Sequence, residues 1–174
     1  LSHSSAASDV YKRQLFTQCA APVEVFTVIE SAPPVLTAQV STAAFASSHT
    51  IEALATGQGI YEYSLDQGPW GDSGTFVDVT PGQRVVTARD LNGCGETQVV
   101  VNVIDYPLYF TPNGDGYNDT WNIVGLANQN SAKILIFDRF GKLIKQISPS
   151  GTGWDGTYNG AQLPSSDYWF TLDY

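Results

Sequence analysis

The chain has 174 residues, a formal net charge of −9 and only 14% charged residues, against about 25% in an ordinary soluble domain. Its longest apolar runs are a few residues, far short of the ~20 that a transmembrane helix needs, so no transmembrane segment is expected. The acidic balance also argues against a nucleic-acid partner, because phosphate binding requires clustered Lys and Arg.

The two ends of the chain differ from its body. Residues 1–14 are rich in Ser and Ala, contain the adjacent cations Lys12 and Arg13, and show no strand alternation. They lack the apolar core of a secretory signal, so we expect a non-native leader, with a disordered native linker as the alternative. The chain contains no methionine, which indicates a processed form or a fragment. At the other end, the alternating segment 167–174 has no turn after it and predicts a domain truncated inside a strand.

Most of the body is predicted to be β-structure, because its apolar residues alternate with a period of two. The Ala-rich run 40–55 is the one helix candidate, although Ser and Thr residues interrupt it. Predicted strands cover residues 23–29, 60–65, 76–79, 85–88 and 99–103, with turn clusters at 57–59, 66–69, 81–82 and 92–93. Short strands at this spacing predict an Ig-like β-sandwich over residues 32–105, preceded at 15–31 by a linker or the end of an earlier repeat.

Two cysteines mark a trace of internal repetition. Cys19 and Cys94 are each followed, at the same offsets, by a Val-Ile-acidic triplet. They are therefore interpreted as equivalent positions of successive repeats, the alternative being chance similarity between two Val-rich strands. A disulfide between them would suit an oxidising location, but equivalent positions would not pair with each other, and unpaired thiols are favoured.

The segment from Gly59 to Glu96 carries an ordered set of motifs: Y-x-Y-S-L-D from Tyr61, G-P-W from Gly68, F-V-D-V-T-P-G from Phe76, and A-R-D-L-N-G-C from Ala88. This series resembles the repeats of large surface adhesins of gliding Bacteroidetes. Tyr61, Tyr63 and Leu65 are expected on one face of a strand, directed inward. The resemblance implies a spacer or adhesive module.

A second unit is predicted over residues 106–174. Residues 132–147 indicate a β-hairpin that turns at Arg139-Phe140-Gly141, and Asn159-Gly160 indicates a second tight turn. The unit is similar to the gliding-motility-associated C-terminal domain, the type B sorting domain of the type IX secretion system. The matching sorting-motif residues include Pro112, Asn113, Gly114, Asp115, Gly116, Asn118, Asp119, Arg139, Gly141, Trp154, Asp155 and Gly156.

This resemblance implies two consecutive β-sandwich domains, the second of them incomplete, at the C-terminal end of a secreted or surface-attached protein. Its partner would be the outer-membrane secretion and attachment machinery. The family continues for another hairpin strand beyond the last residues of this chain, so the final strand is expected to expose an association-prone edge.

One loop has the composition of a cation site. Asn113, Asp115 and Asp119 offer side-chain oxygens at alternating positions, and Tyr117 offers a carbonyl, which suits Ca²⁺. The loop lacks the closing bidentate Glu of an EF-hand. The alternative is a rigid turn in which Asp and Asn side chains bond their own backbone.

Four tryptophans, at positions 70, 121, 154 and 169, could stack on sugars, with Trp70 the most exposed candidate, but core packing is the more common role. His49 stands alone in a Ser/Thr-rich segment, as an exposed or satisfied polar side chain, and no catalytic motif is present. The chain is therefore predicted to be non-enzymatic. The alternative function is a calcium-dependent carbohydrate-binding module of a multidomain extracellular enzyme, with a surface polysaccharide as partner.

Overall fold

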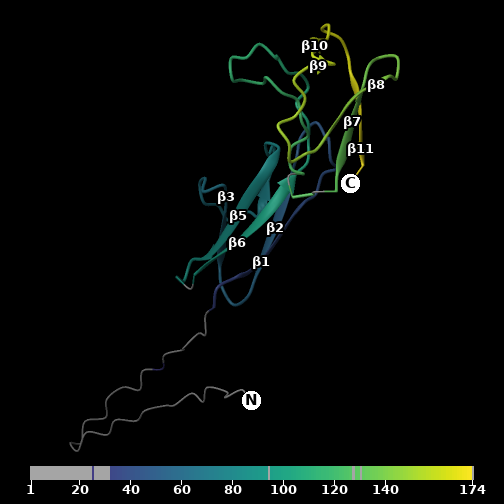
Figure 1. Ribbon diagram of the computed structural model, residues 1–174. Coiled ribbons are helices and arrows are strands. Elements are labelled where there is room, and N and C mark those ends of the chain that lie inside the picture. The colour runs from purple at the N-terminus through teal and green to yellow at the C-terminus, as the bar shows by residue number, and fades with distance from the viewer. Residues whose placement is uncertain (1–24, 26–31, 94, 127, 130, 174) are drawn as a thin grey trace, which may run out of the picture.

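The computed structural model describes residue 25 and residues 32–93, 95–126, 128–129 and 131–173 (Figure 1). The predictions for the leader, for nearly all of residues 15–31, for both cysteines and for the chain end at Tyr174 lie outside these residues. Within the described residues there are eleven strands and no helix. The predicted all-β fold class is confirmed.

The upstream unit is built from two three-stranded antiparallel sheets. One has the order β1-β2-β4 and the other the order β3-β5-β6. The strand bounds are β1 Val35–Val40, β2 Ile51–Thr56, β3 Tyr61–Leu65, β4 Thr75–Phe76, β5 Gly82–Asp90 and β6 Glu96–Val103. After β3 the chain crosses between the sheets: Gly71 forms an isolated bridge with Tyr63 of β3, and the Gly74 carbonyl then accepts a hydrogen bond from Ala53 of β2 at 2.8 Å.

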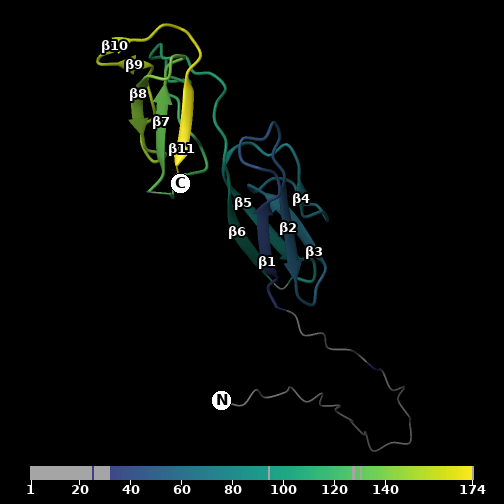
Figure 2. The same cartoon turned by 90° about the vertical axis from the view of Figure 1, so that its right-hand side faces the viewer.

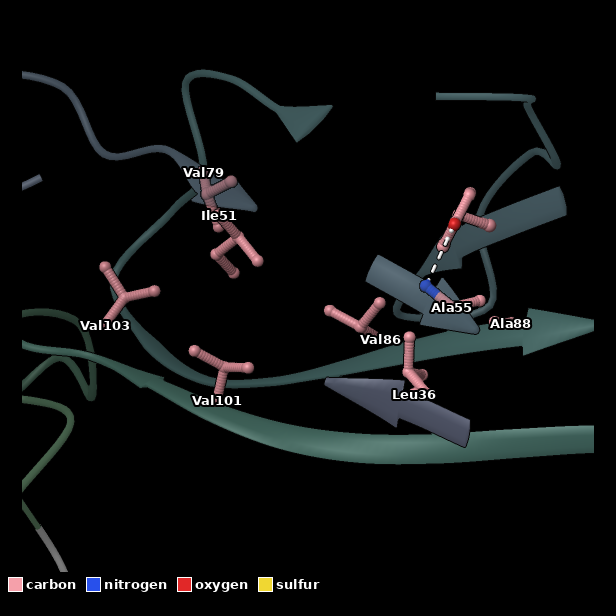
Figure 3. Packing of buried hydrophobic residues seen from close by; sticks show 9 residues of the cluster. Leu36, Ile51, Ala55, Val79, Val86, Ala88, Val101 and Val103 are labelled. Atoms are coloured by element: carbon pink, nitrogen blue, oxygen red, sulfur yellow. Dashed lines mark hydrogen bonds between the residues drawn. The ribbon is translucent and has the colours of Figure 1, made fainter. Parts of the chain in front are cut away.

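The inner faces of the two sheets form one hydrophobic core (Figure 3). Ile51 of β2 and Val86 of β5 are completely buried, and the hydroxyl oxygen of Tyr63 in β3 accepts a hydrogen bond from the Ala55 amide at 3.0 Å. Tyr61 and Leu65 pack against the same cluster, so the inward direction expected for Tyr61, Tyr63 and Leu65 is confirmed. The period-two pattern thus places every second residue between the sheets.

The helix candidate at 40–55 is wrong. Residues 35–40 form β1, residues 51–56 form β2, and the two strands pair antiparallel along their whole length. In β2 the buried positions Ile51 and Ala55 alternate with exposed Glu52 and Leu54. Sheet pairing therefore overrides the helix propensity of alanine. The strand predicted at 76–79 is also too long, because Asp78 adopts a left-handed φ of 53° that interrupts an extended strand.

The downstream unit contains a three-stranded antiparallel sheet of order β11-β7-β8 and a small hairpin of β9 and β10. The strands are β7 Lys133–Phe137, β8 Leu143–Ile147, β9 Thr157–Tyr158, β10 Ala161–Gln162 and β11 Trp169–Asp173. The hairpin predicted at 132–147 is present as β7 and β8. The hydrophobic core of the downstream unit contains Ile134 and Ile136 of β7. They pack with Trp121, Ile123 and Trp154, which lie on irregular segments opposite the sheet.

The two units meet at a joint (Figure 2). The Phe45 amide donates to the Ile104 carbonyl at 3.2 Å, and the Phe45 ring lies 5.4 Å from that of Tyr106 between centroids. Close by in the sequence, His49 is only 3% exposed and its Nε2 lies 3.1 Å from a carboxylate oxygen of Asp105. A loop of the upstream unit therefore contacts the first residues of the downstream unit.

Candidate functional site

The loop at 113–119 is folded around the carboxylate of Asp119. Its two oxygens accept hydrogen bonds from the backbone amides of Gly114 and Gly116, each at 2.7 Å. Both glycines have left-handed φ values, 78° and 88°, which a residue with a Cβ rarely adopts. The glycines therefore allow the backbone to curl so that its amides converge on one carboxylate.

Asn113 and Asp115 stabilise the same loop from the other side. The Asn113 amide group donates to Asp115 at 2.7 Å, and a carboxylate oxygen of Asp115 accepts from the Tyr117 backbone amide at 2.8 Å. These bonds, that of Asn113 first, lower the pKa of Asp115 below its ordinary value, because they favour the charged carboxylate. The loop closes where the Thr111 amide donates to the Asn118 carbonyl at 2.7 Å.

These contacts bear directly on the two interpretations of the loop. The structure brings Asn113, Asp115, Tyr117 and Asp119 together, but each carboxylate oxygen of Asp115 and Asp119 already accepts a hydrogen bond from within the loop. In the described part of the chain, no group of three or more His, Cys, Asp or Glu side chains could hold a metal. The geometry favours the rigid turn, and calcium binding stays a prediction.

A second motif segment surrounds Trp154, whose side chain is 2% exposed. Trp154 and Trp121 exchange backbone hydrogen bonds at 2.8 and 2.9 Å, and the Trp154 indole donates to the Thr157 carbonyl at 2.9 Å. Asp155 accepts from the Thr157 hydroxyl at 2.7 Å, and this bond is the largest cause of the lowered pKa of Asp155. The segment is a turn locked onto the core.

The two motif segments touch at Gly156. A Cβ at this position, where φ is 77°, would lie 3.2 Å from the ring of Pro112 and 3.4 Å from that of Phe110. The absence of a side chain therefore allows the chain entering the 113–119 loop to pack against the Trp154 turn. Sequence motifs 42 residues apart, at Pro112 and Trp154, are thus parts of one structural unit.

The third motif segment is the β7–β8 turn. Asp138 accepts hydrogen bonds from the backbone amides of Phe140 and Lys142 at 2.8 and 2.9 Å, and Gly141 has a φ of 81°. The Arg139 guanidinium lies 4.9 Å from the centroid of the Phe140 ring. The predicted turn at Arg139-Phe140-Gly141 is present, and its contacts are local.

The tryptophans divide between core and surface. Trp121 and Trp154 are buried at 9% and 2% exposure, whereas Trp169 is 66% exposed. Trp70, expected to be the most exposed, is only half-buried, with the Arg89 guanidinium 4.1 Å from its ring centroid. That expectation is wrong because Arg89 occupies the ring face by a cation–π contact. Sugar binding by these side chains stays a prediction.

Sequence reasoning missed a groove beside β11. It has a volume of about 850 Å³ and lies between residues 106–113 and residues 162–170. Leu108 and Tyr109 on one wall and Trp169 on the other are strongly exposed. The sequence held only a weak signal, the unpatterned apolar run at 106–110, because the groove forms from segments some 50 residues apart.

A comparison with protein families identifies the downstream unit. Residues 104–174 match the family model described as the CHU_C type IX secretion signal domain. This part of the chain is a type IX secretion signal domain. The predicted sorting domain is therefore confirmed, while the resemblance of residues 59–96 to adhesin repeats stays a prediction. No curated protein and no solved structure matches the chain.

The type IX secretion signal domain indicates a protein exported to the cell surface or the extracellular space, with its C-terminal region in a sorting role. Such a signal also implies an interaction with the secretion machinery. Among the described residues, no helix has the length and apolar character to cross a membrane.

Proposed function

We propose that the type IX secretion signal domain directs export and surface attachment by presenting a folded β-domain to the outer-membrane machinery. The match over residues 104–174 carries this proposal. Support comes from the motif segments themselves, because Asp119, Asp138 and Asp155 each use a carboxylate to fix a turn. The family motifs thus maintain the shape of three loops, and such fixed loops are suited to recognition by a partner.

For the upstream unit we propose a non-catalytic role as a spacer or adhesive module. Two of its titratable side chains are engaged in structural contacts: His49 lies against Thr42 and Asp105, and Arg89 is hydrogen-bonded to Glu62 at 2.8 Å. A general base needs a ring nitrogen within reach of a substrate proton, and both ring nitrogens of His49 have protein partners. A compact sandwich with such contacts is suited to holding other domains at a distance from the cell surface.

A reporter experiment tests the sorting role. A fluorescent protein carrying an export signal to the periplasm is fused in front of the full 174-residue chain and expressed in a bacterium with a type IX system. We expect fluorescence on the cell surface or in the medium. The matched control carries residues 1–103 alone and should remain in the periplasm. Equal distribution of the two fusions would contradict the proposal.

Loop variants then separate recognition from folding. Phe140→Ser changes an 81% exposed side chain at the β7–β8 turn, and Tyr117→Ser changes a 78% exposed one in the 113–119 loop. Neither side chain belongs to a core, so both variants should keep the melting temperature of the parent protein. If the machinery reads these loops, at least one variant reduces surface fluorescence. Unchanged export in both would place recognition elsewhere on the domain.

A further inference from the structure

The sheet of β11, β7 and β8 has an outer face, directed away from the core. Figure 2 shows the three strands side by side. On the inner face, Ile134, Ile136 and Phe170 pack into the core. Their neighbours along each strand point the other way, because successive side chains alternate between the two faces of a sheet. Trp169 of β11 and Leu143 of β8 are accordingly 66% and 48% exposed. The outer face is thus accessible to a ligand.

This face carries an apolar row beside a row of hydrogen-bonding side chains. Trp169 pairs with Phe137 of β7, and Phe137 pairs with Leu143, so the three lie next to one another across the sheet. Adjacent strands are about 4.8 Å apart, which makes the row about 10 Å long. Two residues further from the β7–β8 turn, Thr171 and Gln146 are exposed on the same face. A strand added beside β11 would widen this face without covering it, because these side chains stand perpendicular to the sheet.

Two cations without an acidic partner lie beside the apolar row. Arg139 and Lys142 are exposed in the β7–β8 turn, and neither forms an ion pair with a described residue. The carboxylate of Asp138 in the same turn is bonded to backbone amides. Every other cation of the described residues has an acidic neighbour: Arg84, Arg89 and Lys145 in ion pairs of 3.0, 2.8 and 3.9 Å, and Lys133 opposite Asp173 in the strand register. In a chain of net charge −9, this turn therefore favours an anionic ligand.

We propose that the outer face binds an acidic polysaccharide built from uronic acid units. The C–H groups on one side of a sugar ring stack on Trp169, because the face of an aromatic ring is negative. The sugar hydroxyl groups bond to Thr171 and Gln146, and the carboxylates lie near Arg139 and Lys142. A single apolar row flanked by polar groups suits sugar rings, whereas the centre of a protein interface is broadly apolar. This binding is separate from the sorting role and adds a ligand to it.

The probe is a hexamer of galacturonic acid, titrated into the nitrogen-15-labelled full chain. Chelator is present throughout, because uronates bind calcium themselves. We expect the indole N–H signal of Trp169 to shift, while that of Trp70, whose ring is covered by Arg89 at 4.1 Å, stays in place. The fully methyl-esterified hexamer keeps the sugar rings without their charge and should bind about threefold to tenfold more weakly. Added salt should weaken binding of the acidic hexamer.

Three protein variants complete the test. Trp169→Ala, which also assigns the indole signal, should weaken binding about fivefold to tenfold. The double substitution Arg139→Gln with Lys142→Gln should remove the preference for the acidic over the esterified hexamer. Lys145→Gln is the matched control and should bind like the parent protein, because Lys145 pairs opposite Ile136 and so lies on the inner side of the same hairpin. The amide spectrum of each variant reports whether its fold is intact.

The proposal is wrong if the acidic hexamer at millimolar concentration leaves the Trp169 signal unchanged, or if the esterified hexamer binds as tightly as the acidic one. A capped peptide of six glutamates that binds as tightly as the sugar would assign the face to an acidic protein partner instead. Self-association of the parent chain that Trp169→Ala abolishes, measured by sedimentation velocity without sugar, would assign the face to a second copy.

Discussion

At the scale of single residues, aspartates fix the exposed loops of the secretion signal domain. Asp119, Asp138 and Asp155 each accept hydrogen bonds from nearby backbone amides. Bonds to a charged acceptor are stronger than neutral ones, and each amide so bound is one that the loop would otherwise leave to water. The chemistry is local, so the sequence N-G-D-G-Y-N-D could indicate it directly.

Replacement of Asp119 by Ala should loosen the 113–119 loop. The amides of Gly114 and Gly116 lose their acceptors, so their hydrogen exchange should accelerate about tenfold or more, in line with about 1.5–3 kcal/mol for a hydrogen bond to a charged group. Asp138→Ala is the matched control: it should accelerate hydrogen exchange at the amides of Phe140 and Lys142 and leave exchange at Gly114 and Gly116 unchanged. Unchanged exchange at Gly114 and Gly116 in Asp119→Ala would show that the carboxylate does not hold the loop.

Calcium binding by the same loop has its own test. Calcium should raise the melting temperature relative to chelator if Asn113, Asp115, Tyr117 and Asp119 bind the ion, since a ligand of the folded state stabilises it. Asp115→Asn should remove that effect. Equal melting temperatures in calcium and in chelator would leave the loop as a turn held only by its own hydrogen bonds.

The pKa of Asp155 should depend on Thr157. The hydroxyl bond from Thr157 is the main cause of the lowered pKa, and Thr157→Val removes it. Because this pKa is lowered in the folded state, the Asp155 carboxylate stabilises the fold at pH values above its unfolded-state pKa. The stabilisation is lost as the pH falls through the folded-state pKa. We therefore expect the pKa of Asp155 in Thr157→Val, followed by NMR of its carboxyl carbon, to rise toward 3.8. No rise would mean that the backbone bonds dominate.

At the scale of elements, local turn chemistry made the β7–β8 and β9–β10 hairpins predictable. Gly141 and Asn159-Gly160 have left-handed φ values, at 81°, 49° and 81°, as their residue types indicate. The strands β1 and β2 were harder to predict from the sequence, because their register depends on residues that are far apart along the chain: Val35 pairs with Thr56, 21 positions later. The groove beside β11 was beyond sequence reasoning for the same reason, since its walls come from separate segments.

Truncation of a β7 side chain should destabilise the secretion signal domain. Ile134 is completely buried in the core of this unit. Ile134→Ala should lower the free energy of unfolding by about 2–5 kcal/mol, through lost burial and the cavity left behind. Leu143→Ala on the neighbouring β8 is the control, because that side chain is 48% exposed and its loss should cost about 0.5 kcal/mol or less. Equal effects in chemical denaturation would contradict the assigned core.

At the scale of the whole molecule, the joint between the two units depends on one loop of the upstream unit. Phe45 has a left-handed φ of 64°, which is uncommon for an aromatic residue and persists only where surrounding contacts enforce it. Its ring lies 5.4 Å from that of Tyr106 and 5.9 Å from that of Phe170. With His49 bonded to Asp105, this loop connects the core of one unit to the aromatic cluster of the other, so we expect the two to tumble as one body.

Phe45→Asn tests this coupling with little disturbance of the backbone. Asn tolerates a left-handed φ better than most residues, so the loop conformation stays available. The substitution removes the ring contacts, which contribute about 0.5–1.5 kcal/mol for each aromatic pair. Nitrogen-15 relaxation should then give each unit a shorter rotational correlation time than in the parent protein. Val77→Asn alters a side chain that is 67% exposed in the same unit and should leave the rotational correlation times of both units unchanged. Unchanged correlation times in Phe45→Asn would show that the contacts it leaves in place, the backbone bond from residue 45 to Ile104 and the His49–Asp105 contact, are enough to couple the two units.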